Sequence, residues 1–474
     1  MNNIYKIIIC ILIIFLSLIA LSSCFFYEEY SGDFMVFSSI NNDTEYGVSI
    51  VRKHGEKDSI DEFKGVIPKE YNGKPVTSIG SMNRYCADSL IIPNNIQKIE
   101  EGAFGLCKVK EVIFEKESQV ISIGNAFAGN TVIEEILLPD SLVNIGDAAF
   151  MNCTSLIYLN IPSKILQIGE FAFMNCLSLK NINFEEESSL ETINRFSFRN
   201  CKNITKITLP KSIKIIKEFA FMDCENLVEV DNQIESNLEK IGAGAFASCR
   251  KLNLFILNEN LKIIEPSAFA ECNNFFPYIP KNVNNIGSSA FSDIAFCEAD
   301  TKPEGWDDDW LFSSYIFTTF DTNSIYWGVE REDIIIKDDF IYIKDNGNVI
   351  LAKYIGTEEK IEIPSQVEGI FVTEIGKSAF EGILLSSVIL NDFIIKINEI
   401  SFWYCSDLGA IIIPQNVDYI GNYAFSRCNN LESVTVRSII PPQLGENVFS
   451  YTSDNLKIYV PAESLDAYKT AKGL

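Results

Sequence analysis

Cysteine and histidine are the side chains most often used as nucleophiles or metal ligands, and this chain of 474 residues has thirteen cysteines but one histidine. Nine of the cysteines follow a phenylalanine by three residues, as in "NIGDAAFMNC" at 144–153. A cysteine in such a motif could be a reactive thiol, a metal ligand or half of a disulfide. The nine are Cys107, Cys153, Cys176, Cys201, Cys224, Cys249, Cys272, Cys405 and Cys428.

The same slot tolerates other side chains elsewhere in the sequence, where it holds Asn130, Ile294, Ile383 and Thr452. A position that accepts isoleucine does not require a thiolate, and free cysteine packs as a small hydrophobe. The sequence therefore predicts a ladder of buried cysteines. Disulfide pairing or metal capture stays open as an alternative, because stacked strands lie about 5 Å apart, although no CxxC pair or zinc-type Cys/His spacing occurs.

The remaining chemistry would have to come from carboxylates, because His54 is the only histidine. One histidine excludes multi-histidine metal sites and makes an imidazole-based triad or dyad hard to build. In "WDDDW", Asp307, Asp308 and Asp309 are a weak calcium candidate, since the ligand spacing of a calcium loop is missing, and packing of the two tryptophans is the other interpretation. The acidic runs at 114–118, 184–189 and 234–237 are interpreted as solvated loops. We therefore expect no enzyme, no cofactor and no small-molecule substrate.

The composition indicates a large folded chain and argues against nucleic-acid binding. Hydrophobic residues make up 47% of the sequence and aromatic residues 12%, which is enough for a sizeable core. The formal net charge is -25. Phosphate backbones are bound through clustered Lys and Arg, so we expect no nucleic-acid partner.

The first 23 residues differ from the rest. An apolar run of 15 residues, "IIICILIIFLSLIAL" at 7–21, follows Lys6 and is shorter than the roughly 20 residues of a spanning helix. It has the size of the apolar region of a secretory signal. The following "LSSC" at 21–24 resembles the bacterial lipobox, which implies that Cys24 carries acyl chains such as palmitate. An ordinary signal peptide, cleaved nearby or retained, is the alternative.

The cysteine motif is one part of a longer repeat. Its anchor phenylalanines recur every 22 to 25 residues within each of two runs. A fixed period of about 20 to 29 residues built on Leu and Ile is typical of leucine-rich repeats, whose units bury a continuous core only when stacked. The anchors are Phe104, Phe127, Phe150, Phe173, Phe198, Phe221, Phe246, Phe269 and Phe291, then Phe380, Phe402, Phe425 and Phe449.

Each unit predicts a short strand, a proline and a second, tighter segment. In "LIYLNIP", Leu156, Leu159 and Ile161 form an apolar stripe, and Pro162 ends the strand because it has no N–H for the ladder. The Ala-Phe pair that follows should begin a short helical or turn segment on the opposite side. The fold class expected is an α/β repeat solenoid rich in short β-strands.

The pattern "L-x-x-[IVL]-x-[ILF]-P" followed by "[IL]-G-x-x-A-F-x-x-C" resembles the BspA-like leucine-rich repeat family of bacterial surface proteins, over most of residues 65–474. "EADTKPEGWDDDW" with the later "IYWGV" looks like the family's separator between repeat blocks, and "LKIYVPAESLDAYKTA" looks like its closing strand and helix. The resemblance implies a non-enzymatic binding protein that attaches to host matrix proteins, host cells or other bacteria.

The two predicted repeat blocks begin with similar sequences. "IPKEYNGKPVTSIG" at 67–80 and "IPSQVEGIFVTEIG" at 363–376 align without a gap, and each follows a strand-like pair broken by a turn. We expect these hairpins to cap exposed end coils. The predicted organisation is a lipoprotein signal peptide at 1–23, a tether at 24–36, a first repeat block with its N-terminal cap at 37–296, an acidic separator at 297–338 and a second block with a C-terminal cap at 339–474. One continuous solenoid with an inserted loop is the alternative.

Stacked strands expose the side chains that lie between the buried ones, and in leucine-rich repeats that face is commonly used for binding. We therefore expect protein contacts there. The candidate residues are Tyr158, Asn160, Asn181, Asn183, Lys206, Thr208, Ser433 and Thr435, with Ser387, Ile389, Ala410 and Ile412 at equivalent positions.

Two hypotheses follow for the place and role of the protein. One is an exported lipoprotein adhesin anchored in the bacterial envelope, at the outer membrane or cell surface, whose partners are proteins. The other is a periplasmic or envelope scaffold that binds the cell's own components. The sequence does not identify the ligand.

Overall fold

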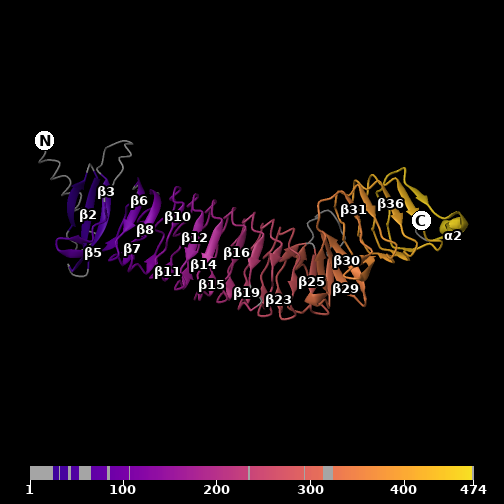
Figure 1. Ribbon diagram of the computed structural model, residues 1–474, viewed down its shortest axis with the longest axis horizontal. Coiled ribbons are helices and arrows are strands. Elements are labelled where there is room, and N and C mark those ends of the chain that lie inside the picture. Colours follow the sequence, from indigo (N-terminus) through magenta and orange to yellow (C-terminus); the bar gives the residue numbers. More distant parts are fainter. Residues whose placement is uncertain are drawn as a thin grey trace. The chain divides into compact units, whose positions relative to one another are not determined.

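The computed structural model describes residues 25–30, 33–40, 44–52, 66–82, 86–105, 107–232, 235–292, 294–312 and 324–471. These residues form a β-solenoid in which short parallel strands follow one another, coil by coil, joined by turns (Figure 1). The chain divides into two compact units. The first contains the described parts of 1–275, 282–292 and 305–310, and the second those of 276–281, 293–304 and 311–474.

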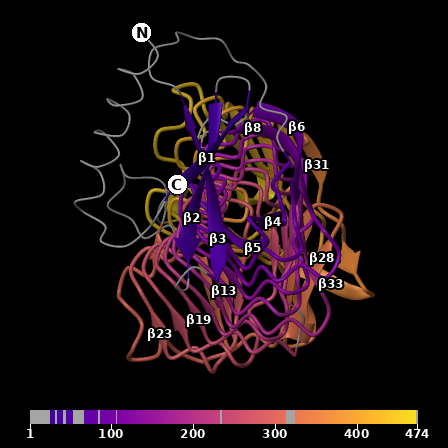
Figure 2. The same ribbon diagram turned by 90° about the vertical axis from the view of Figure 1, so that its left-hand side faces the viewer.

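Two faces of the coils carry strands in the first unit. Figure 2 shows β6 and β8 of one face apart from β13, β19 and β23 of the other. The short-strand sheet runs in the order β1 (Phe25–Tyr30), β2 (Asp33–Ile40), β3 (Glu45–Arg52), β5 (Lys74–Ile79), β7 (Lys98–Ile99), β9 (Ser122–Ile123), β11 (Asn144–Ile145), β13 (Gln167–Ile168), β15 (Thr192–Ile193), β17 (Ile215–Ile216), β19 (Lys240–Ile241), β21 (Ile263–Ile264) and β23 (Asn285–Ile286), with β4 (Glu70–Tyr71) paired to β5. On the other face lie β14 (Asn181–Phe184), β12 (Tyr158–Ile161), β10 (Glu135–Ile136), β8 (Lys108–Phe114) and β6 (Cys86–Ile92), and then the sheet of β16 (Lys206–Thr208), β18 (Glu229–Asp231) and β20 (Leu254–Phe255); β24 (Phe291–Ser292) is also in this unit.

The second unit repeats the plan. Its short-strand sheet runs β28 (Ile334–Lys337), β29 (Phe340–Asp345), β30 (Asn348–Tyr354), β33 (Ile370–Ile375), β35 (Lys396–Ile397), β37 (Tyr419–Ile420) and β39 (Gln443–Leu444), with β32 (Gln366–Val367) paired to β33. The other sheets are β31 (Lys360–Glu362) with β34 (Ser387–Ile389), β36 (Ala410–Ile413) with β38 (Ser433–Val436) and β40 (Lys457–Tyr459), and β22 (Tyr278–Ile279) with β25 (Ile294–Cys297) and β27 (Ser324–Trp327). The unit also contains β26 (Leu311–Phe312), the 3-10 turns η1 (Arg331–Asp333) and η2 (Ala462–Ser464), and helix α2 (Leu465–Thr470).

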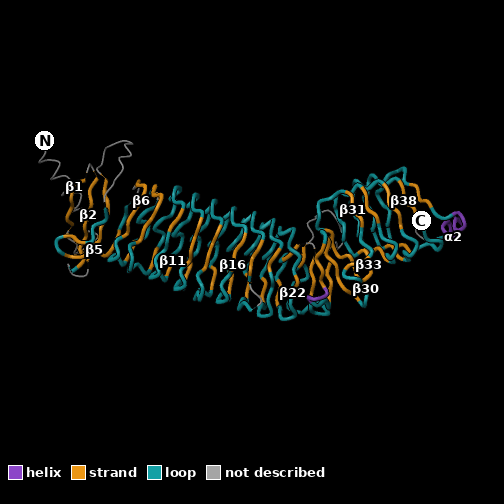
Figure 3. The backbone as a smooth tube through the Cα atoms, viewed as in Figure 1, coloured by secondary structure: helices purple, strands orange, loops and turns teal. Residues whose placement is uncertain are grey.

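The expected repeat solenoid is confirmed, but the α/β description of it is not. Helix α2 is the one α-helix in the part of the chain that the structure describes, and Figure 3 shows the coils as strands and turns. The Ala-Phe segment is a turn because it is flanked by left-handed residues, with φ of 58° at Phe171 and 61° at Asn175. A right-handed helix cannot pass through such residues.

The compact units interleave between residues 275 and 311, so they do not establish the predicted division into two repeat blocks. The boundaries at 296 and 338 stay a prediction.

The anchor phenylalanines form the centre of each unit. In the first unit Phe150 stacks on Phe173 with ring centroids 5.2 Å apart and planes 3° from parallel, and both are fully buried. In the second unit Phe402 stacks on Phe425 at 5.1 Å. The ring spacing is close to the roughly 4.8 Å that separates neighbouring strands, so each ring packs directly on the rings of the coils beside it. Close approach between coils also explains one glycine: a Cβ at Gly169 would lie 2.4 Å from the backbone of the previous coil.

The predicted strand-ending role of proline is confirmed at Pro162 and Pro414, which directly follow β12 and β36. The structure adds a hydrogen-bond partner for the turn after Pro162. Strand β12 ends at Ile161, directly before Pro162, and the Ser163 N–H donates to the carboxylate of Glu185 at 3.0 Å. Glu185 is the first acid of the run at 184–189, so the coil that carries it secures the turn of the coil before. Glu115 accepts from the Asn94 N–H at 3.0 Å in the same way.

The two hairpins have the same structure in both units. Strand β3 pairs with β2 in antiparallel fashion and with β5 in parallel, and β30 pairs likewise with β29 and β33. Both parallel pairings have a register shift at the same point, between Tyr46 and Gly47 and between Val349 and Ile350. The predicted similarity of the two openings therefore extends to the bulge, and each hairpin continues the short-strand sheet of its unit.

Candidate functional site

The predicted contact residues lie on the strands of the coil face that does not carry the short-strand sheet. We call the outward side chains of these strands the strand face of each unit. In β12, Leu159 and Ile161 are buried whereas Tyr158 is 52% exposed and Asn160 is half-buried. The alternation follows from the period of two in a strand, with one side packed on the core. The strand face is therefore formed by residues that the core does not need.

The structure brings four of the predicted residues together. Tyr158 lies opposite Asn181 and Asn160 opposite Asn183 in the parallel ladder of β12 and β14. The Asn183 side-chain amide donates to Asn160 at 2.6 Å, and the Asn160 amide donates to Glu185 at 2.9 Å. The amides form a row across coils, so part of their hydrogen-bonding capacity is used within the protein.

Lys206 and Thr208 lie on β16, in the coil that follows β14, opposite Glu229 and Asp231 of β18. The Lys206 ammonium is 2.7 Å from the Glu229 carboxylate, and this hydrogen bond raises the pKa of Lys206. The charge of Lys206 is therefore already matched by the next coil. Thr208 is exposed and available for contacts.

The other predicted residues belong to the second unit. Ser433 lies opposite Ala410, and Thr435 opposite Ile412, in the ladder of β36 and β38. Ser433 and Thr435 are half-buried, whereas Ile412 is 48% exposed. Ser387 and Ile389 lie on β34, where Ser387 is half-buried and Ile389 is exposed. The predicted set thus contains two strand faces, one in each unit.

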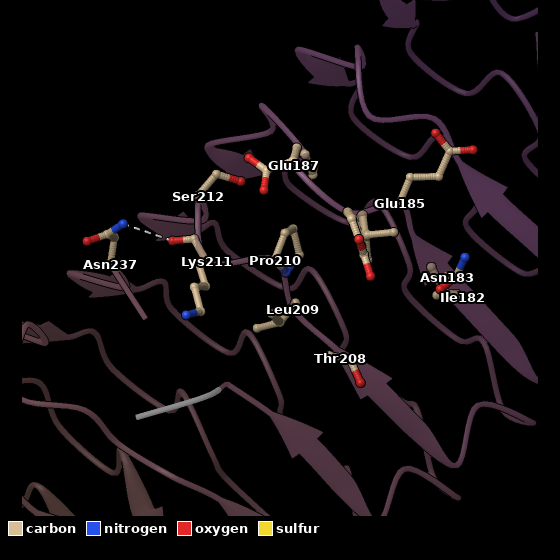
Figure 4. A pocket seen from close by; sticks show the side chains of 13 residues that line it. Ile182, Asn183, Glu185, Glu187, Thr208, Leu209, Pro210, Lys211, Ser212 and Asn237 are labelled. Atoms are coloured by element: carbon tan, nitrogen blue, oxygen red, sulfur yellow. Dashed lines mark hydrogen bonds between the residues drawn. The ribbon is translucent and has the colours of Figure 1, made fainter. Parts of the chain in front are cut away.

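A hollow of about 680 Å³ lies beside the predicted residues of the first unit. Asn183 and Thr208 line it, together with the acidic run that follows β14. Figure 4 shows Leu209 and Pro210 between Asn183 on one side and Lys211 on the other. The wall at Lys211 is held by the next coil, whose Asn237 side chain donates to the Lys211 carbonyl at 3.0 Å. The hollow offers exposed carboxylates and hydroxyls to a partner.

A second hollow, of about 390 Å³, involves residues that the sequence analysis did not select. It lies over β8 and β10, and its lining includes Glu111, Ile113, Glu135 and Leu137. The sequence did contain a signal, because apolar residues occupy positions that the strand period turns outward. Their exposure could be assigned only once the register of these strands was known.

The cysteine ladder is structural, as predicted from its tolerance of isoleucine. All nine of its thiols are buried, and none of the nine forms a disulfide. Burial raises the pKa of Cys153 to about 12 and that of Cys428 to about 12. A thiol is nucleophilic as the thiolate, so these groups are held in the unreactive form near neutral pH.

The slot also has a hydrogen-bonding role that the sequence analysis missed. Each ladder thiol points at a backbone carbonyl of the coil before: the Cys153 sulfur is 3.3 Å from the Phe127 oxygen, and the Cys176 sulfur is 3.3 Å from the Phe150 oxygen. Asn130, which occupies the slot in another coil, also donates to a backbone carbonyl of the preceding coil: its side-chain amide is 3.0 Å from the Val109 oxygen. The slot therefore favours a small donor to the preceding coil.

The weak calcium candidates lie on a coil that is secured by its tryptophans. Trp306 and Trp310 are buried, with ring centroids 4.8 Å apart in a T-shaped contact, and the Trp306 indole N–H donates to the Val283 carbonyl at 3.0 Å. Asp307, Asp308 and Asp309 are exposed. Within the described ranges, no group of three or more His, Cys, Asp or Glu side chains could hold a metal ion.

The signal peptide predicted at 1–23 and the lipid attachment predicted at Cys24 fall outside the described residues, and so does His54. Among the residues that are described, none of the helices has the length and apolar character needed to cross a bilayer.

Stacked coils of 22 to 25 residues, each with a short strand, a turn and a buried aliphatic and phenylalanine core, define a leucine-rich repeat solenoid. The chain matches the family "BspA type Leucine rich repeat region", in six copies, over residues 82–188, 172–297 and 353–468. The chain belongs to this family, as its motifs predicted.

Comparison with the curated proteins found no match. Similar solved structures include a leucine-rich repeat protein of Bacteroides ovatus, at 20% identity and a TM-score of 0.44, covering 95% of this chain and 96% of that one. The pneumococcal vaccine antigen PcpA is 20% identical, with a TM-score of 0.34 and coverage of 93% and 89%. A leucine-rich cell surface protein of Faecalibacterium prausnitzii is 19% identical, with a TM-score of 0.28 and coverage of 95% and 99%.

Proposed function

We propose that this protein is a non-enzymatic, exported lipoprotein that uses the strand face of its solenoid to bind proteins in adhesion. The observation that carries the proposal is the strand face itself: rows of outward side chains in register across coils, with hollows of about 680 and 390 Å³ beside them. Such a surface suits a partner that spans several coils.

The location rests on the N-terminal sequence. The apolar run at 7–21 followed by "LSSC" supports export and lipid attachment at Cys24. A tether at 24–36 would then connect the lipid to the solenoid. The proposed site of display is the outer membrane or cell surface, and the proposed partners are host extracellular matrix proteins, host cell-surface proteins or proteins of other bacteria.

Protease treatment of intact cells tests the display. Peptides released from residues 114–470 should appear in the medium, while a periplasmic marker protein stays intact. Full protection of the solenoid before lysis would contradict surface display and favour a periplasmic or envelope scaffold that binds the cell's own components.

A matched pair of variants tests the binding face. Thr208→Arg changes the strand face, whereas Gln167→Arg adds the same charge at an exposed position on short strand β13 of the same unit. Adhesion of cells to immobilised extracellular matrix proteins should fall with Thr208→Arg and persist with Gln167→Arg. Equal adhesion of the two variants would contradict a role for the strand face.

A further inference from the structure

The strand face of the first unit begins with an apolar row. Ile91 of β6 lies opposite Ile113 of β8, and Leu137 follows Ile136, which pairs with Val112. Their side chains are exposed by 44%, 39% and 66% for Ile91, Ile113 and Leu137. Adjacent strands lie about 4.8 Å apart, so the row spans about 10 Å, which matches roughly three residues of extended chain. Exposed aliphatic side chains aligned in this way mark a contact surface.

Unmatched acidic groups adjoin the row. Glu111 lies directly opposite Glu135 on the neighbouring strands β8 and β10, and both are exposed. Like charges opposite one another destabilise a sheet. No lysine or arginine of the described residues forms an ion pair with either carboxylate; the nearby Lys110 is paired with Asp88 at 2.6 Å.

Coils further along the same unit are arranged differently. There a cation on one coil meets an acid on the next, as in Lys202–Glu225 at 2.8 Å and Lys206–Glu229 at 2.7 Å. Their charges are balanced within the protein. The pair Glu111 and Glu135 departs from this arrangement at the point where the apolar row and the 390 Å³ hollow meet.

We propose that this hollow, which we call the acidic groove and define by Glu111, Ile113, Glu135 and Leu137, binds an extended segment of a partner protein that presents Lys or Arg and an apolar residue two positions apart, on the same face of the segment. Apolar side chains of the segment would cover Ile113 and Leu137, and its cations would neutralise the facing carboxylates. The net charge of -25 favours the approach of such a segment and disfavours anionic lipid, nucleic acid or a second copy of this chain. The proposal rests on the proposed protein-binding function of the strand face and specifies the partner.

Labelled synthetic peptides test the groove. The probe is Lys-Ser-Ile-Ser-Lys-Ser-Ile, which carries Lys and Ile on one face when extended, and the controls are Lys-Ser-Ser-Ser-Lys-Ser-Ser and Glu-Ser-Ile-Ser-Glu-Ser-Ile. Fluorescence anisotropy is measured at low salt with the full chain in a non-ionic detergent, against detergent alone. The Lys/Ile probe should bind about tenfold more tightly than either control. Equal binding of the Lys/Ser peptide would show that charge alone is recognised and would overturn the proposal.

Variants locate the site. Glu111→Gln with Glu135→Gln should weaken binding of the Lys/Ile probe about tenfold, and Ile113→Ser with Leu137→Ser should weaken it similarly. Asp307→Asn with Asp309→Asn makes the same charge change at exposed residues of the first unit that line neither hollow, and should leave binding within about twofold. An equal loss in that control, or no loss in the groove variants, would overturn the proposal.

The outcome separates this proposal from the function on which it rests. If the probe fails while Thr208→Arg still reduces adhesion, the acidic groove is not the contact but the strand face is. If Thr208→Arg is also without effect, the binding function itself is contradicted.

Discussion

At the residue scale, the recurring cysteine shows how a reactive side chain can be a structural one. Cys153 is buried and its thiol lies 3.3 Å from the Phe127 carbonyl of the preceding coil. Desolvation raises its pKa because the thiolate would lose its hydration in the core. The same buried arrangement recurs along the stack, at nine of the thirteen slots that follow an anchor phenylalanine.

The raised pKa predicts a loss of stability in alkali. Below pH 9 the Cys153 thiol is protonated in both the folded and the unfolded chain, so its contribution to stability is complete. Between its ordinary pKa of 9.0 and its folded value of about 12 the unfolded chain loses the proton first, and the free energy of unfolding falls by about 1.4 kcal/mol per pH unit for this thiol. Urea unfolding of the reduced protein at pH 7, 9, 10 and 11 measures this slope.

The control for that prediction is Cys153→Ala, in which the other ladder thiols still titrate. Its slope above pH 9 should be shallower than that of the unmodified protein by the share of one thiol. Parallel slopes for the two proteins would contradict the assignment of this pH dependence to Cys153.

At the element scale, each coil is closed by hydrogen bonds to the coil beside it. Phe150 donates from its backbone N–H to the Ala172 carbonyl at 2.7 Å, while the Gly146 N–H donates to the Ile123 carbonyl at 2.7 Å on the opposite side of the coil. The ladder slot adds a third connection through its side chain. A coil therefore needs both neighbouring coils to hydrogen-bond its backbone groups as well as to bury its apolar side chains.

Asn130 tests that connection, because it is fully buried and makes three hydrogen bonds. Its amide donates to the Val109 carbonyl, and its oxygen accepts from the N–H groups of Val132 and Ile133 at 3.2 Å. Asn130→Ala should lower the free energy of unfolding by about 2 to 3 kcal/mol, since buried groups lose their partners. Asn130→Cys should cost less, because a thiol in this slot can donate to the preceding coil. Chemical denaturation compares the two, and an equal loss would contradict the donor role.

At the scale of the whole molecule, the contacts of a coil are with its neighbours, so a unit is extended or shortened by whole coils. The anchor rings illustrate this: Phe150, Phe173 and Phe198 are stacked at 5.2 Å in succession. Removing a complete period leaves the outer two in the same relation.

Deletion of residues 151–173 tests this modularity. Phe150 would then precede Met174, and the sequence at the junction, Phe-Met-Asn-Cys, would be unchanged. The variant should keep the β-sheet signal per residue in circular dichroism and lose only the few kcal/mol contributed by one coil. Deletion of 151–161, about half a coil, should disrupt the unit because the faces of later coils no longer match. Similar melting of the two deletions would contradict modular stacking.

The solenoid could be predicted from the sequence because the same pattern of residues recurs in every unit. Period, apolar stripe, strand-ending proline and anchor phenylalanine each recur, and the structure confirms them, as it confirms the outward positions of Tyr158 and Asn181. The presence of Asn130 and Ile294 in the cysteine slot is enough to indicate a buried structural role for that slot from the sequence alone.

Other features were decided by tertiary structure. The Ala-Phe segment became a turn because Phe171 and Asn175 take left-handed conformations, which are set by the bonds and packing between coils and which the residue types do not require. Glu111 lies opposite Glu135 because of the register between β8 and β10, which pairs residues 24 positions apart in the sequence. The sequence pattern within a unit determines the strand, the turn and the buried residues of one coil. The stacking of coils determines which side chains contact each other across coils and which stay exposed to a partner.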